Sequence, residues 1–152
     1  MKFDIGFAVS DKDIVATYSV VKQLRPNVKE SDYLKLVRLQ EHEVHFRLAY
    51  LKVRGHVECV AGFRLCRSLG WGKYLYVDDL VTNKNLRSKG VGKMMFSWLV
   101  DYACKEGCDE LRLDSAVYRH EAHRFYLRER MDISCFNFSV DLRGRSRKRH
   151  RS

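Results

Sequence analysis

A glycine-containing turn between an apolar strand and an amphipathic helix constrains this chain more than any other feature. Residues 74–82 have the composition of a strand, and a polar connection over 83–89 follows them. Residues 90–105 then repeat apolar side chains at helical spacing until Gly107 ends the pattern. The turn Arg-Ser-Lys-Gly-Val-Gly at 87–92 therefore lies at the amino end of a helix, where backbone amides point outward.

A turn of this kind predicts an anion-binding site, because glycines let a phosphate approach the backbone while Arg87, Lys89 and Lys93 add positive charge. Two other nucleotide-binding loops do not fit. A Walker A loop needs a glycine where Arg87 stands and a hydroxyl where Met94 stands. A Rossmann turn needs a third glycine where Met95 stands. A glycine cap that merely turns the chain remains the structural alternative.

The remaining pattern predicts strands and helices mixed around one sheet. Residues 3–9 alternate as a strand, and Ser10 with Asp13 resembles a capping box that opens a helix ended by Pro26. The other expected elements are a helix after Ser31, a hairpin of 46–53 with 57–66 around Arg54-Gly55-His56, a strand at 111–117, a helix at 121–129 and a last strand at 133–142, where Phe136, Phe138, Val140 and Leu142 alternate.

The length of 152 residues fits one domain, which we expect to span residues 1–142. Residues 143–152 hold five Arg and one Lys without an acid, so the tail carries six of the ten net positive charges. Such a run predicts a disordered, solvated arm that either binds nucleic acid or an acidic partner or only aids solubility. The chain begins with charge in its first apolar stretch and has no long apolar run, which predicts a cytoplasmic protein without a membrane contact.

The five cysteines form an odd set without a Cys-x-x-Cys pair, and we expect them to be reduced and mostly buried. Cys104 and Cys108 stand one helical turn apart and could offer two metal ligands. A zinc site normally needs four ligands, and no histidine stands at the spacing of a zinc finger. The sequence therefore predicts no metal.

Four segments together resemble the core of the GNAT superfamily of acetyl-CoA-dependent N-acetyltransferases. They are Tyr-Leu-Tyr-Val-Asp-Asp-Leu-Val-Thr at 74–82, Arg-x-x-Gly-x-Gly at 87–92, Leu-Arg-Leu-Asp-Ser at 111–115 and Ala-His-Arg-Phe-Tyr at 122–126. The resemblance implies an α/β fold with a mostly antiparallel sheet, splayed between the strands at 74–82 and 111–117 and flanked by about four helices. It covers residues 74–131 closely and the rest in outline.

The resemblance also implies where acetyl-CoA would bind. Backbone groups of one strand would receive the pantetheine arm, backbone amides of the turn would receive the pyrophosphate, and a side chain just before the last helix would lie near the pantetheine or adenosine end. In this chain these residues are Leu80, Val81 and Thr82, then Arg87, Ser88, Lys89, Gly90, Val91, Gly92 and Lys93, and finally Arg119. Many family members carry Asn where Arg119 stands and a Gly near Arg130, so this end of the site departs from the family pattern.

Three residues are candidates for catalysis. Tyr126 stands where many family members place a tyrosine near the cofactor sulfur, and its phenol could supply the proton that the leaving thiolate needs. Asp78 and Asp79 could attract a cationic amine and relay its proton. Because they are adjacent on a strand, we expect their side chains on opposite faces, only one of them toward the acceptor. Structural alternatives are a packed surface tyrosine and an acid satisfied by backbone or basic neighbours.

The expected function is acetyl transfer from acetyl-CoA to a primary amine, by direct attack in a ternary complex. The acceptor is a small cationic amine or a protein lysine or N-terminus, including a ribosomal or other nucleic-acid-associated protein that the basic tail would help recruit. The alternative is a non-enzymatic CoA-binding sensor with a nucleic-acid-binding tail. Asp114 is a third candidate acid, and a homodimer is open.

Overall fold

A five-stranded sheet forms the centre of residues 2–114, the larger of two units into which the chain divides. The computed structural model describes residues 2–145, and the rest of the predicted basic tail lies outside this range. The strands lie side by side in chain order: β1 (Phe3–Phe7), β2 (Arg47–Val53), β3 (His56–Ser68), β4 (Gly72–Thr82) and β5 (Glu110–Leu113). The first four are antiparallel, and β5 runs parallel to β4. This mixed sheet confirms the predicted fold class.

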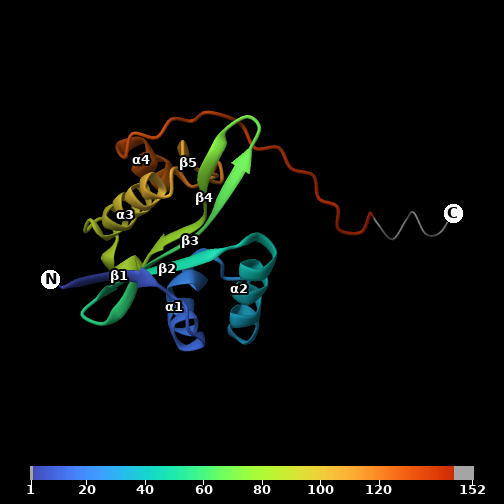
Figure 1. Cartoon of the computed structure of the whole chain (residues 1–152). Helices are drawn as coiled ribbons and strands as arrows, with labels where there is room; N and C mark the ends of the chain where they lie inside the picture. Colours follow the sequence, from blue (N-terminus) through green and yellow to red (C-terminus); the bar gives the residue numbers. More distant parts are fainter. Residues whose placement is uncertain (1, 146–152) are drawn as a thin grey trace. The chain divides into compact units, whose positions relative to one another are not determined.

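Helices cover both faces of the sheet (Figure 1). On one face lie α1 (Asp11–Leu24) and α2 (Glu30–Val44), packed over a core that includes Ile14, Val37 and Val81. On the other face α3 (Val91–Lys105) packs over Leu75, Val77 and other residues of the larger core. Burial of these apolar side chains, and not helix propensity, provides most of the stability of such helices.

Local sequence signals determine several of the boundaries. The Ser10 hydroxyl accepts a hydrogen bond from the Asp13 amide at 3.1 Å, which caps α1 as predicted. The β2–β3 hairpin turns at Arg54 and Gly55, both with positive φ, as a two-residue turn between strands requires. Two expected strands are longer than the observed ones, because β1 ends at Phe7 and β5 ends at Leu113.

Residues 115–145 form the second unit, which contains α4 (His120–Arg128) preceded and followed by irregular chain. The predicted last strand over residues 133–142 is wrong: this segment is not a strand in the structure. Alternation alone does not make a strand, because the backbone also needs a neighbouring edge with which to exchange hydrogen bonds. The sheet in the described residues consists of β1 to β5, to which this segment contributes no strand, and its side chains Phe136, Phe138, Val140 and Leu142 are exposed.

None of the helices in the described range has the length and apolarity that crossing a bilayer requires.

Candidate functional site

The sheet opens along β4 because its neighbour β5 is short. The two strands pair at only four positions, from Tyr74 opposite Glu110 to Val77 opposite Leu113. Beyond Val77, β4 continues to Thr82 while β5 has ended. Residues 78–82 therefore have no β5 partner on this edge, and their backbone can bind an extended ligand as an added strand would bind.

A β-bulge interrupts β4 where the sheet opens. Val77 lies opposite Phe63 and Asp79 lies opposite Gly62, so Asp78 is an extra residue without a partner of its own on β3. The bulge reverses the alternation of side chains: Val77 packs in the core under α3, and so does Leu80, three positions on. A regular strand would have placed these two side chains on opposite faces.

The bulge corrects the expectation that Asp78 and Asp79 point to opposite faces. Asp79 contacts Arg25, which follows α1, while Asp78 contacts Arg64, which lies opposite Tyr76 on β3. Both carboxylates therefore lie on the face of the sheet that α1 and α2 cover. The structure brings together two acids that the sequence pattern had separated.

Asp79 is the more enclosed of the two acids, with a side chain that is 18% exposed. The Arg25 Nε donates a hydrogen bond to its Oδ1 at 2.8 Å, and the same guanidinium donates to the Asp78 carbonyl at 3.0 Å. Burial raises the pKa of Asp79; the Arg25 guanidinium opposes this rise and the Asp78 charge adds to it. Asp79 is thus a carboxylate prepared to accept a proton.

Gly62 makes room for this carboxylate. A Cβ on Gly62 would stand 2.4 Å from the Phe46 ring and 3.0 Å from Asp79 Oδ2. Phe46 is buried, so its ring has little freedom to move away. A glycine inside a strand commonly marks such a close approach, so Gly62 is a local sequence signal for this site.

Asp78 is held in a network of its own. Arg64 donates two hydrogen bonds to its carboxylate, at 2.8 and 3.0 Å, and lies over the Tyr76 ring at 5.0 Å. The Tyr76 hydroxyl in turn bonds to Asp114, just beyond β5. Burial, followed by the bond to Asp114, raises the pKa of Tyr76, which keeps its phenol neutral. Asp78, Asp79 and Asp114 thus form an acidic group at the open end of the β4–β5 pair.

A buried tyrosine on α2, Tyr33, is close enough to Asp79 for its charge to act on the phenol. The Tyr33 hydroxyl lies 2.7 Å from the Thr17 Oγ1, which also donates to the Ile14 carbonyl. Burial raises the pKa of Tyr33 to about 12, with the Asp79 charge contributing in the same direction. Tyr33 and Arg25 were not predicted as site residues, because they are far from β4 in sequence and no motif contains them.

The turn after β4 has the geometry that anion binding requires. Gly90 is the N-cap of α3, with a φ of 82° and no side-chain capping bond, and Ser88 also has positive φ. The amides of Val91, Gly92 and Lys93 begin the helix, where they have no intrahelical acceptor. Three exposed cations, Arg87, Lys89 and Lys93, lie in the turn and the first helical turn. Arg87 Nε also donates to the Thr82 carbonyl at 3.4 Å, which links the turn to the end of β4.

The side chains of the predicted β4 contacts are used within the protein. Leu80 packs against the core under α3, Val81 is buried in the core under α1 and α2, and the Thr82 hydroxyl lies 3.5 Å from Cys59 Sγ. Only their backbone groups are left for a ligand. Backbone recognition of this kind fits a flexible, amide-containing chain whose far end is a diphosphate.

Two predicted site residues belong to the unit of residues 115–145. Arg119 is the N-cap residue of α4, and Tyr126 lies on that helix, half-buried, with its ring 5.5 Å from the Phe125 ring. Their roles beside the cofactor stay predictions. Arg130 has a φ of 63°, so it adopts the left-handed conformation that glycine favours.

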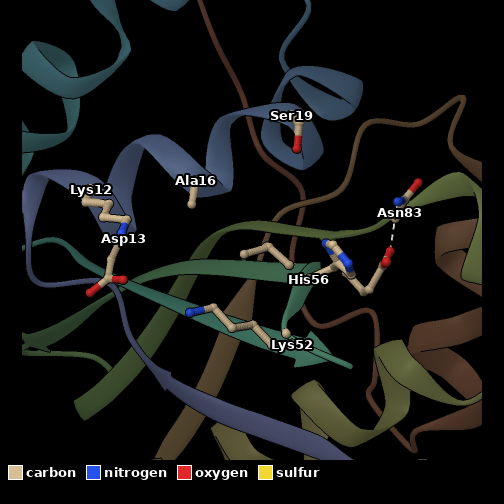
Figure 2. Close-up of a pocket in the computed structure, with 10 residues that line it drawn as sticks. Lys12, Asp13, Ala16, Ser19, Lys52, His56 and Asn83 are labelled. Carbon is tan, nitrogen blue, oxygen red and sulfur yellow. Dashed lines mark hydrogen bonds between the residues drawn. The ribbon is translucent and has the colours of Figure 1, made fainter.

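A separate polar hollow of about 510 Å³ lies between α1 and the β2–β3 hairpin (Figure 2). Lys12, Lys52 and His56 line it, and Asn83 closes one end with a 2.8 Å hydrogen bond to Glu58. None of the predicted site residues lines it. Over residues 2–145 the structure has no cluster of three or more His, Cys, Asp or Glu side chains that could hold a metal ion.

Comparison with known proteins gives a family match over residues 13–131, to the acetyltransferase (GNAT) family. The uncharacterized N-acetyltransferase YhdJ of Bacillus subtilis is 30% identical over 117 residues, which are 77% of this chain and 82% of that protein. An aminoalkylphosphonate N-acetyltransferase of Salmonella typhimurium is 28% identical over 138 residues, 86% of each protein.

Solved structures share the fold at lower identity. The aminoglycoside N-acetyltransferase AAC(6')-Iy in complex with CoA superposes with a TM-score of 0.79 at 14% identity, covering 92% of this chain and 94% of that one. This likeness concerns the fold alone.

Proposed function

The chain belongs to the GNAT family of acetyltransferases, and from this premise we propose that it transfers acetyl from acetyl-CoA to a primary amine by direct attack in a ternary complex. The observation that carries the proposal is the placement of Asp79 at the open end of β4, enclosed, with a raised pKa and beside two further acids. An acyl-transfer enzyme for amines needs a base in this position, because an ammonium must lose a proton before it can attack.

The residues fit acetyl-CoA in two places. The unpaired edge of residues 78–82 would receive the amide groups of the pantetheine arm. The amides that begin α3, with Arg87, Lys89 and Lys93 around them, would receive the pyrophosphate. When bound, acetyl-CoA supplies the activated acetyl thioester.

The acid–base roles fall to residues of this chain. Asp79 accepts the proton of the acceptor ammonium at its carboxylate, directly or through one water. Its raised pKa brings it nearer to neutral pH and so makes it a better base than an exposed aspartate. Asp78 holds Arg64, and thereby shapes the same face of the sheet. Tyr126 supplies a phenolic proton to the departing sulfur, a role proposed from its motif position.

The acceptor is a cationic amine. Asp78, Asp79 and Asp114 gather negative charge at the open end of β4, which favours an ammonium over a neutral or anionic acceptor. Arg25 is half-exposed and bonded to Asp79, so an incoming ammonium would take its place beside the carboxylate. This exchange leaves the guanidinium free for another contact.

A second candidate acceptor is a zwitterionic aminoalkylphosphonate, the substrate class named for the Salmonella relative. The presence of Arg25 and Arg64 among the acids favours it, because guanidinium groups bind phosphonate oxygens in a bidentate manner. An ammonium at Asp79 and a phosphonate at Arg25 would satisfy both ends of such a molecule.

A thiol-release assay over an amine panel tests the proposal. The panel contains a polyamine, an aminoglycoside, an aminoalkylphosphonate and a lysine peptide, each with acetyl-CoA. Turnover of at least one amine, lost in Asp79→Asn, is the expected result. A preference for the aminoalkylphosphonate that disappears in Arg25→Ala would favour the second candidate. Absence of acetyl-CoA binding by calorimetry would overturn the proposal as a whole.

A further inference from the structure

Gly62 on β3 leaves a space beside the Asp79 carboxylate that the Phe46 ring fills. Gly62 lies opposite Asp79 on β4. A Cβ on Gly62 would stand 2.4 Å from Phe46 Cζ, 2.7 Å from Phe46 Cε2 and 3.0 Å from Asp79 Oδ2. The edge of the ring and one carboxylate oxygen therefore border the same small space, which has the size of a methyl group.

The backbone determines where this ring lies. Phe46 is placed between the end of α2 and the start of β2. His45, just before it, has a left-handed φ of 56°, and the Phe46 amide donates a hydrogen bond to the Gln40 carbonyl of α2 at 3.2 Å. The Phe46 side chain is 5% exposed and belongs to the core under α1 and α2. A ring packed at this depth excludes water from the space at Gly62.

The two carboxylate oxygens of Asp79 have different neighbours. Oδ1 accepts the 2.8 Å hydrogen bond from Arg25, whose side chain is 48% exposed. Oδ2 lies beside the edge of the Phe46 ring, which carries the positive part of the ring quadrupole. The terminal torsion of an aspartate is broad, so these two contacts, and not the torsion itself, determine where each oxygen points.

We propose that Phe46 is a positioning residue for acetyl transfer: its ring, placed at Gly62, orients the Asp79 carboxylate so that Oδ1 receives the proton of the acceptor. The N–H bond of the ammonium breaks, its electron pair stays on the nitrogen, and the proton passes to Oδ1. The inference rests on the proposed role of Asp79 as the base, and it adds a residue that acts on the reaction through Asp79.

Replacing Phe46 leaves the charges around Asp79 in place. The ionisable groups that interact with this acid are Arg25 after α1, Asp78 on β4 and the Tyr33 phenol on α2. Burial has the largest influence on the pKa of Asp79 and raises it. A shorter side chain at position 46 would admit water to Oδ2, which favours the charged form of the acid and lowers this pKa.

NMR of carbon-13-labelled aspartate carboxyls tests the contact without any turnover. The Asp79 signal is assigned by its absence in Asp79→Asn. In Phe46→Leu, which lacks the ring atoms that reach Gly62, the titration midpoint of Asp79 should move to lower pH by about one pH unit. The matched control is Phe63→Leu, which shortens a fully buried phenylalanine in the core under α3 and should keep the wild-type midpoint. An unchanged midpoint in Phe46→Leu, or an equal shift in Phe63→Leu, would overturn the inference.

A double variant distinguishes the contact from a general loss of packing. Gly62→Ala combined with Phe46→Leu places a methyl group beside Oδ2, in the space that the ring atoms have left. The midpoint of Asp79 should therefore move back toward the wild-type value. A midpoint as low as that of Phe46→Leu alone would count against the inference.

Thiol-release kinetics relate the contact to the reaction. In Phe46→Leu, the acid limb of kcat/KM should follow the NMR midpoint to lower pH. Its kcat should fall about tenfold with an unchanged KM for acetyl-CoA, because a displaced base loses its alignment. Full turnover in Asp79→Asn would refute the proposed base itself. Loss of turnover in Asp79→Asn, together with a wild-type kcat and pH profile in Phe46→Leu, would refute only the role of Phe46.

Discussion

The Arg25 guanidinium and the Asp79 carboxylate, 54 positions apart in sequence, meet at 2.8 Å on the face of the sheet where β4 loses its neighbour. The contact stabilises the charged form of an acid whose burial favours the neutral form. Arg25 therefore sets how readily Asp79 releases and accepts a proton.

Replacing Asp79 tests the proposed base directly. Asp79→Asn keeps the shape of the side chain but cannot accept a proton, so kcat should fall by about 100-fold or more. Asp78→Asn is the matched control, and its kcat should fall less. This variant removes one hydrogen-bond acceptor of Arg64, but it does not remove the proton acceptor of the substrate. Equal losses in the two variants, measured by steady-state thiol release, would contradict the assignment. Calorimetry should show unchanged acetyl-CoA affinity in both.

Removing Arg25 should move the acid limb of the pH profile. The pKa of Asp79 is already raised by burial, and loss of the cation raises it further, so the base is protonated at a higher pH. In Arg25→Ala, kcat/KM should therefore begin to fall at a higher pH as the solution is acidified, whereas Arg25→Lys should restore much of the wild-type profile. Arg38→Ala, which removes another ion-paired arginine, should leave the profile unchanged. A wild-type profile in Arg25→Ala would show that Asp79 does not govern this limb.

Tyr126→Phe tests the proposed acid. The change removes one hydroxyl and keeps the ring, so kcat should fall by about 100-fold while the Kd of acetyl-CoA stays the same. Tyr118→Phe, at an exposed tyrosine of the same unit, should have no effect on either quantity. Unchanged turnover of Tyr126→Phe would exclude the phenol as the proton donor.

Gly90 and Gly55 have the same φ of 82°. A comparison of alanine variants at these two positions therefore distinguishes the effect on backbone strain from the effect on ligand binding. A Cβ on Gly90 or Gly55 meets no atom within 4 Å, so either alanine variant should lose only about 1–2 kcal/mol of stability, the cost of a left-handed residue. Gly90→Ala should also weaken acetyl-CoA about tenfold, which corresponds to about 1.4 kcal/mol, since the amides around it bind the pyrophosphate. Thermal unfolding and calorimetry measure the two effects. Equal affinity in both variants would argue against the turn as the phosphate site.

The sequence was most informative where the signal is local. The turn at 87–92 could be predicted because its glycines and lysine all lie within six consecutive residues that connect a strand to a helix. The fold class followed from the order of the predicted strands and helices. The orientation of the Asp78 and Asp79 carboxylates was harder to predict from the sequence. Alternation counts every residue of a strand equally, so it cannot register the extra residue at Asp78.

Long-range contacts explain the remaining differences. Arg25 bonds to Asp79, Phe46 closes the space at Gly62 beside it, and the Asp79 charge acts on Tyr33. All three residues come from other elements, and no sequence motif contains any of them. The last strand was predicted wrongly, because side-chain alternation shows that residues 133–142 could form a strand but does not show that their backbone exchanges the hydrogen bonds of one.

The bulge at Asp78 means that the number of residues in β4, as well as their types, determines which face of the sheet the two carboxylates occupy. In a regular strand an extra residue would turn every following side chain to the opposite face, and the bulge at Asp78 absorbs that shift. Deleting Asp78 would leave Val77 and Leu80 two positions apart, so both would still face α3 in a regular strand. The inserted residue therefore adds a second carboxylate to the face that α1 and α2 cover and leaves the core under α3 unchanged.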